Sequence, residues 1–222
     1  MTDALETRLA LPITKAVTSA EGQSSFRHAD SGIGNLQLGV KWNFLKDRMP
    51  LAAALDLDLP TANSANNPAS LGQRYSTQIQ QGFNAHLQVI ADTPKMADLL
   101  TGHASVGYMN TGAYTTAAKT RFNPSDLMTF GASLDLSMER WIHHVSLSAE
   151  AVGNTGLSHS KSNSTMNGSD LGTVIEVGPA VRYQVGALRA YTGFLADVGK
   201  ATYRAYNYRV NFGVSMLWGG AQ

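Results

Sequence analysis

A serine, histidine and glutamate cluster contains the first residues whose types could support catalysis. Ser146, Ser148 and Glu150 alternate along one stretch, and His144 precedes them at the same spacing. A serine beside a histidine and an acid is the arrangement of a hydrolytic nucleophile. Such same-face neighbours are also common wherever polar residues share one face of a strand, and no nucleophile-elbow motif is present. We therefore expect no enzyme activity and no catalytic residue.

Histidines could supply a second kind of chemistry, metal binding. His86 and His103 fall in neighbouring stretches, where they could become diagonal neighbours and hold a metal ion. No third ligand is evident, so we expect Gln88 and Ser105 to be the partners of the two rings. The histidines at 143–144 point to opposite faces, which suits an interfacial position better than chelation. The sequence contains no cysteine, which excludes thiolate sites and disulfides, and we expect neither a metal nor a cofactor.

Charged and imidazole side chains recur at the polar positions of stretches that alternate polar and apolar residues. An alternation of period two places all polar residues of a strand on one face. The set expected on that face is Lys41, Asp56, Asp58, His86, His103, Asp135, Glu150, Glu176, Arg182, Arg189, Asp197 and Arg209, together with Arg8. Both signs are interspersed in this set, which argues against strong selectivity for anions or cations.

β-Strands must position these side chains, and the clearest strand lies near the end of the chain. Its apolar face carries Tyr206, Tyr208, Val210, Phe212, Val214, Met216 and Trp218. A soluble sheet would bury this face, whereas a membrane β-barrel turns it to lipid and keeps the polar face in its lumen. About nine further stretches alternate similarly, at 5–13, 35–44, 51–59, 83–89, 100–108, 128–136, 144–150, 175–184 and 189–197. We expect one all-β domain over 1–222, a transmembrane antiparallel up-and-down barrel.

Composition agrees with a membrane barrel. The 222 residues are 43% hydrophobic and only 15% charged, whereas globular proteins average about 25% charged residues. No apolar run approaches the roughly 18 residues of a membrane helix. The formal net charge of +1 and the lack of a basic run interleaved with aromatics give no reason to expect nucleic acid as a partner.

The connections alternate in length, which indicates the direction of the strands. Long links rich in glycine, serine and asparagine lie at 18–32, 62–76, 112–126 and 153–171, and short ones lie near Asp47, Pro94, Arg140 and Gly186. Outer-membrane barrels place short turns in the periplasm and long loops outside. Both ends of the chain are then expected on the periplasmic side.

The polar face admits two interpretations once it lines a lumen. A turn centred between Arg48 and Met49 would place Lys41 directly opposite Asp56. Such pairs could form a structural network of ion pairs and hydrogen bonds that fills a narrow lumen, which is the reading we favour. They could instead form a polar constriction that solutes must pass.

Short motifs follow one another in a consistent order along most of the chain. They are Gly32-Ile33-Gly34-Asn35-Leu36 continuing to Trp42, Leu59-Pro60-Thr61, Tyr108 with Thr111-Gly112, Gly178-Pro179 with Arg182-Tyr183, and Tyr208-Arg209 with Phe212-Gly213. In this order they resemble the outer-membrane β-barrel family named for the meta-pathway of phenol degradation. The resemblance implies a porin-like channel or transporter of the Gram-negative cell outer membrane that admits small apolar or aromatic molecules. A barrel with a plugged lumen, serving as a structural or interaction subunit, is the alternative, because fold does not fix function.

The two ends of the chain carry further expectations. Residues 1–7 lack the regions of a signal peptide, and 9–12 resemble an internal strand of the family. We therefore expect about two additional strands upstream, giving a barrel of roughly twelve. Alternatively the ten strands close by themselves, with a seam between 5–13 and 206–218 that Pro12 would weaken, because proline lacks an amide donor.

The expected partners follow from this location. Outer-membrane lipids would surround the apolar face, and the barrel assembly machinery would read an aromatic signal near Trp218. A small hydrophobic solute is the remaining expected partner.

Overall fold

The computed structural model describes residues 5–19, 27–33, 35–45, 50–61, 83–96, 99–112, 114–115, 121–122, 126–157, 173–198 and 208–219. At 14–19, 27–32, 114–115, 121–122, 209 and 219, only the backbone is described. No helix in this part of the chain is long and apolar enough to cross a membrane.

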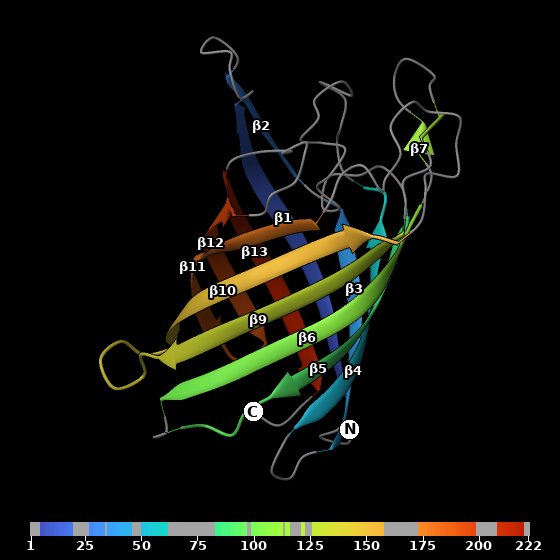
Figure 1. Ribbon diagram of the computed structural model, residues 1–222. Helices are drawn as coiled ribbons and strands as arrows, with labels where there is room; N and C mark the ends of the chain where they lie inside the picture. The colour runs from blue at the N-terminus through green and yellow to red at the C-terminus, as the bar shows by residue number, and fades with distance from the viewer. Residues whose placement is uncertain are drawn as a thin grey trace.

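Antiparallel strands wind into a barrel (Figure 1), as the alternation predicts. The main sheet has eleven strands, and leaving out β2 gives the ten that form the wall. They are β1 (Leu5–Ser19), β3 (Leu36–Leu45), β4 (Leu51–Leu59), β5 (Asn84–Asp92), β6 (Leu100–Thr111), β9 (Leu127–Ser137), β10 (Val145–Gly156), β11 (Thr173–Val185), β12 (Leu188–Asp197) and β13 (Tyr208–Gly219). The transmembrane all-β fold is therefore confirmed.

The first and last strands close the barrel. Pairing between β1 and β13 runs without a break from Glu6 opposite Gly219 to Val17 opposite Tyr208. Pro12 lies within this seam, opposite Gly213, and its missing amide donor does not interrupt the pairing. Of the two alternatives for this seam, the structure shows the one in which the ten strands close by themselves, so that both edges are paired.

Three strands lie where the sequence predicted only long links. β2 (Arg27–Ile33) pairs with the second half of β1, and the two strands reach beyond the barrel rim (Figure 1). β7 (Tyr114–Thr115) and β8 (Arg121–Phe122) form a small hairpin of their own. A strand outside the bilayer needs no apolar face, so the alternation that marks a membrane strand is absent there.

Short turns join neighbouring strands at the end of the barrel where β1 begins and β13 ends. We call this the turn end, and the opposite end, from which the long connections leave, the loop end. Gly186 joins β11 to β12 with a φ of 55°, a left-handed conformation that glycine adopts at no steric cost. The turn after β9 spans 138–144, and His144 closes it with a φ of 66°. The short link predicted near Asp47 lies outside the described residues.

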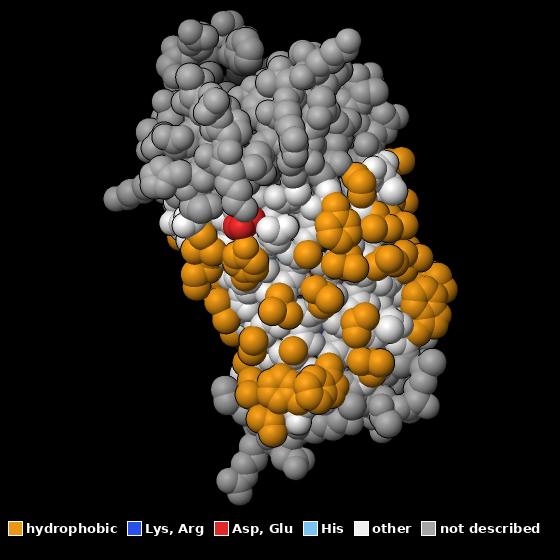
Figure 2. Space-filling model, turned by 90° about the vertical axis from the view of Figure 1, so that its right-hand side faces the viewer, with side chains coloured by type: hydrophobic (Ala, Val, Ile, Leu, Met, Phe, Trp, Pro, Cys, Tyr) orange, Lys and Arg blue, Asp and Glu red, His pale blue; other side chains and the backbone are white. Residues whose placement is uncertain are grey.

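The distribution of apolar and polar side chains in the wall is the reverse of that in a soluble protein. Leu38, Val40 and Trp42 on β3 are 40%, 44% and 56% exposed, whereas the side chains of Asn35 and Asn84 have no exposed surface. Figure 2 shows hydrophobic side chains gathered over the described wall. A surface of this kind is stable only against lipid, so the barrel faces a membrane.

Candidate functional site

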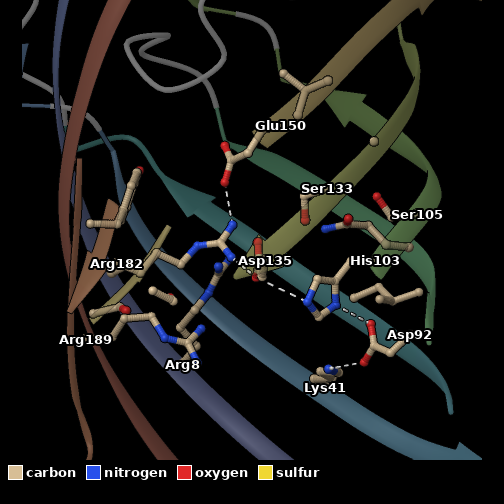
Figure 3. Close-up of a pocket in the computed structure, with 18 of the residues that line it drawn as sticks. Arg8, Lys41, Asp92, His103, Ser105, Ser133, Asp135, Glu150, Arg182 and Arg189 are labelled. Atoms are coloured by element: carbon tan, nitrogen blue, oxygen red, sulfur yellow. Dashed lines mark hydrogen bonds and ion pairs between the residues drawn. The ribbon is translucent and has the colours of Figure 1, made fainter. Parts of the chain in front are cut away.

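A cavity of about 650 Å³ occupies the lumen. Inward side chains from strands all around the barrel line it, and many of them are charged (Figure 3). The charged lining residues are Glu6, Arg8, Lys41, Asp92, His103, Asp135, Glu150, Arg182 and Arg189. The cavity is therefore the place in the described lumen where a solute could meet several charges at once.

Six of the lining residues form a chain of ion pairs that follows the cavity wall from β3 to β11. We call this the lumen ion-pair chain. Its first members are linked by 3.7 Å from Lys41 Nζ to Asp92 Oδ2 and by 2.7 Å from Asp92 Oδ1 to His103 Nδ1. His103 Nε2 then lies 3.2 Å from Asp135 Oδ2. Its last members are Arg182, which donates to Asp135 and Glu150, and Glu150 itself.

His103 connects the two halves of the lumen ion-pair chain. Each of its two ring nitrogens faces a carboxylate, Asp92 on one side and Asp135 on the other. A neutral imidazole has one donor nitrogen, whereas the imidazolium has two. The protonated ring is therefore the form that satisfies both carboxylates, and it ties β5, β6 and β9 together.

A second cluster surrounds two aspartates of β4. Asp56 accepts hydrogen bonds from Arg8, at 2.7 Å, and from Gln88, at 3.0 Å. Asp58 accepts from Gln37 at 3.0 Å and from Asn84 at 3.3 Å. These donors come from β1, β3 and β5, so the cluster joins four strands.

Small residues let the long cations reach their partners across an intervening strand. Arg8 on β1 and Asp56 on β4 both lie opposite Gly39 of β3, and a Cβ at Gly39 would lie 2.4 Å from Asp56 Oδ1. Lys41 of β3 likewise lies opposite Ala54 of β4 before it reaches β5. Side-chain size on the intervening strand thus decides which charges can meet.

The predicted lumen residues fall into three groups in the structure. Those that line the cavity are Lys41, His103, Asp135, Glu150, Arg182 and Arg189. Those that lie elsewhere on the inward face are Asp56, Asp58, His86, Glu176 and Asp197, the last two opposite each other on β11 and β12. The side chain of Arg209 lies outside the described residues, although its backbone pairs with Leu195.

The predicted contact between Lys41 and Asp56 is wrong. Lys41 lies opposite Ala54, and Asp56 lies opposite Gly39, two positions from the predicted register. The pairing of Leu45 with Leu51 beside the turn already differs by one position, and the β-bulge between Asn43 and Leu45 adds the second. Lys41 therefore pairs with Asp92 rather than with Asp56.

The histidine pair is also wrong. His86 lies opposite Met109, whereas His103 lies opposite Asp92, so the rings are far apart along β5 and β6. His86 bonds to Thr129 Oγ1 at 2.7 Å and His103 bonds to two aspartates, instead of to Gln88 and Ser105. The described residues contain no group of three or more histidines and acids able to hold a metal ion.

The candidate hydrolytic cluster does not assemble. Ser148 Oγ lies 3.3 Å from Glu150 Oε1 in the lumen. His144 instead belongs to the exposed turn, where its ring meets the edge of Tyr183 at a centroid distance of 6.2 Å. Ser148 therefore has Glu150 beside it but not the histidine of the predicted cluster.

Sequence reasoning missed several residues of the lumen. Asp92 is not predicted as a lumen residue because the sequence places the end of β5 at Val89. The apolar Ile90 lies on the inward face of β5 and interrupts the alternation that leads from Gln88 to Asp92. Met109 and Leu195 were missed because apolar side chains were assigned to lipid. They are inward, near the loop end, and only 7% and 4% exposed.

Solved structures match the chain although no family model and no curated sequence does. An outer-membrane channel from Pseudomonas putida F1 superposes with a TM-score of 0.62 at 11% identity, covering 98% of this chain and 97% of that chain. The Ralstonia pickettii toluene transporter TbuX gives a TM-score of 0.42 at 8% identity, covering 100% and 90%. OmpF from Salmonella typhi in complex with daunomycin gives 0.41 at 10%, covering 97% and 62%. Together with the apolar wall, the first likeness shows that this chain has the fold of an outer-membrane β-barrel.

Proposed function

We propose that this protein is an outer-membrane channel for small solutes, which pass through its lumen. The observation that carries the proposal is the cavity of about 650 Å³ inside the barrel. At roughly 30 Å³ per water molecule, this space would hold about 20 waters. Barrels of about 8 strands are filled by side chains, and barrels of 16 or more leave a wide aqueous channel. A ten-strand barrel with such a cavity suits a narrow, solute-sized path.

The proposed solutes are small molecules with an apolar or aromatic body. This class comes from the resemblance to the meta-pathway family and from the toluene transporter among the similar structures. The cavity lining adds a condition. Its charged groups must keep their hydrogen bonds, and a wholly apolar solute offers none in exchange. Solutes that carry a polar group beside the apolar body should therefore pass best.

Buried inward side chains at the loop end favour the alternative, a plugged barrel that acts as a structural or interaction subunit. Met109 and Leu195 turn apolar side chains inward there, and both are buried. Asn84 and Glu176 are buried on the same inward face. If these side chains fill the lumen in the membrane, no solute can pass beyond the cavity.

Conductance separates the two functions. Purified barrel in planar bilayers should show discrete ion currents, and Met109→Ala should increase the single-channel conductance because it removes a buried inward side chain from the loop end of the lumen. Leu134→Ala is the matched control, since Leu134 is a 53% exposed side chain of the outer wall. Swelling of protein-loaded liposomes in small solutes should rank the variants in the same order. Absence of current and swelling in wild type and in Met109→Ala would establish the plugged barrel.

A further inference from the structure

Arg189 differs from the other cations that line the cavity. Arg8 lies 2.7 Å from Asp56, Lys41 lies 3.7 Å from Asp92, and Arg182 donates to two carboxylates. Arg189 instead donates from Nε and Nη2 to the neutral amide oxygen of Gln184, at 3.0 and 2.8 Å. Within the described part of the chain, no carboxylate lies within ion-pair distance of its guanidinium.

Two other arginines lie near Arg189 in the cavity. Figure 3 places the Arg189, Arg182 and Arg8 side chains on the same side of the cavity. Glu6 attracts the charge of Arg189 without forming an ion pair with it, and Arg182 and Arg8 repel that charge. Of these three arginines, Arg189 is the one without a carboxylate partner among the described residues, so its guanidinium can bind an anion from outside the protein.

The neighbours of Arg189 on the barrel wall suit one class of anion. Ser215 lies directly opposite Arg189 on β13 and lines the cavity with a hydroxyl. Tyr191, two residues along β12, also lines the cavity, and its ring covers Gly213 so closely that a Cβ there would lie 2.1 Å from Tyr191 Cε1. This part of the wall thus presents a guanidinium and an aromatic ring from β12 and a hydroxyl from β13.

We infer that the cavity holds a binding site for small organic carboxylates, centred on Arg189. The carboxylate accepts hydrogen bonds from Nη1 of Arg189, the nitrogen that does not donate to Gln184, and from the Ser215 hydroxyl, and the apolar body of the ligand lies toward Tyr191. A guanidinium matches the geometry of a carboxylate, and a charge-assisted bond of this kind is about twice as strong as a neutral one. The inference deepens the proposed channel function, because it names the polar group that the permeating solute carries.

Binding can be measured without transport, so the two proposals can fail separately. Fluorine NMR of 4-fluorobenzoate, titrated with the detergent-solubilised full-length barrel, should show saturable binding beyond that of empty micelles. The neutral isostere 4-fluorobenzamide should bind at least about tenfold more weakly, which is the loss expected for one charge-assisted hydrogen bond. Arg189→Gln should weaken benzoate binding by at least the same factor and leave benzamide binding unchanged.

Two further variants keep the test clear. Arg140→Gln removes a cation from the exposed turn outside the lumen and should leave benzoate binding unchanged. Arg189→Lys keeps the charge and should retain part of the binding, which distinguishes a lost site from a misfolded barrel. Equal benzoate affinity in wild type and Arg189→Gln, or no saturable binding in wild type, would overturn the inference. Binding that depends on Arg189 in a barrel without conductance would leave the site in place and reject only the channel.

Discussion

Leu38→Arg should destabilise the folded barrel, whereas the adjacent Gln37→Arg should be tolerated. Leu38 is 40% exposed on the outer wall and lies between Leu9 of β1 and Leu57 of β4. Gln37 points into the lumen, where its Nε2 donates to Asp58 Oδ1 at 3.0 Å. The two substitutions introduce the same side chain one residue apart, so their difference measures only the face of the strand.

The expected magnitude follows from the depth of Leu38 in the membrane. The apolar face of β3 runs from Leu36 to Phe44, with Val40 at its centre. Leu38 is therefore about 5 Å from the centre along the membrane normal, given a rise of roughly 3.3 Å per residue and a strand tilt near 40°. A cation on the lipid face costs roughly 2–4 kcal/mol at the midplane and less toward the interfaces, so we expect about 2–3 kcal/mol. This corresponds to a roughly 30- to 150-fold change in the folding equilibrium.

Urea unfolding of the barrel in lipid vesicles, followed by tryptophan fluorescence, measures this difference. Heat-modifiable migration in a gel reports the folded fraction independently. Gln37→Arg should stay within about 1 kcal/mol of wild type, because the new guanidinium can donate to Asp58. An equal loss of stability in both variants, or a larger loss in Gln37→Arg, would refute the assignment of faces and with it the register of β3.

Two other perturbations test the lumen contacts and the turn. Gly39→Val should displace the Asp56 carboxylate and break its bond with Arg8. The free energy of unfolding should fall by about 1–2 kcal/mol and not by more, because the ion pair is partly exposed to solvent. An unchanged urea midpoint would contradict this. The His143 ring, 3.0 Å from Glu139, lowers the pKa of that carboxyl. The Glu139 carboxylate therefore stabilises the turn fully at a pH above the ordinary carboxyl pKa, and this stabilisation is lost as the pH falls through the lowered pKa of Glu139. Amide hydrogen exchange of the turn should show this pH dependence, and Glu139→Gln should abolish it.

Alternation alone predicted which way the side chains of the membrane strands face. It succeeded because a strand in lipid must keep one face apolar along its whole length, as β13 does from Tyr208 to Trp218. It failed where that requirement is absent. β2 lies beyond the rim and has no apolar face to detect, and Met109 and Leu195 turn apolar groups inward at the loop end.

Contacts in the lumen were less predictable than faces. The predicted partner of Asp56 is Lys41, but the pairing differs by two positions and places Gly39 there. The bulge after Asn43 accounts for one position, and the pairing of Leu45 with Leu51 beside the turn accounts for the other. Because successive side chains of a strand alternate between its two faces, a register shift of two residues leaves every side chain on its predicted face but gives it a different partner on the neighbouring strand. The ion pairs also skip strands, as Arg8 does when it passes Gly39, and no pattern within one strand encodes such a contact.

Conduction through the lumen is the central claim, and a single cysteine tests it most directly, since the natural sequence contains none. Ser105 lines the cavity, and its neighbour Val106 is 46% exposed on the outer wall. A charged, water-soluble thiol reagent should lower the current of single Ser105→Cys channels in discrete steps and leave Val106→Cys channels unchanged. If mass spectrometry shows complete labelling of Ser105→Cys while its current stays at the unlabelled level, ions do not pass through this cavity and the channel proposal is wrong.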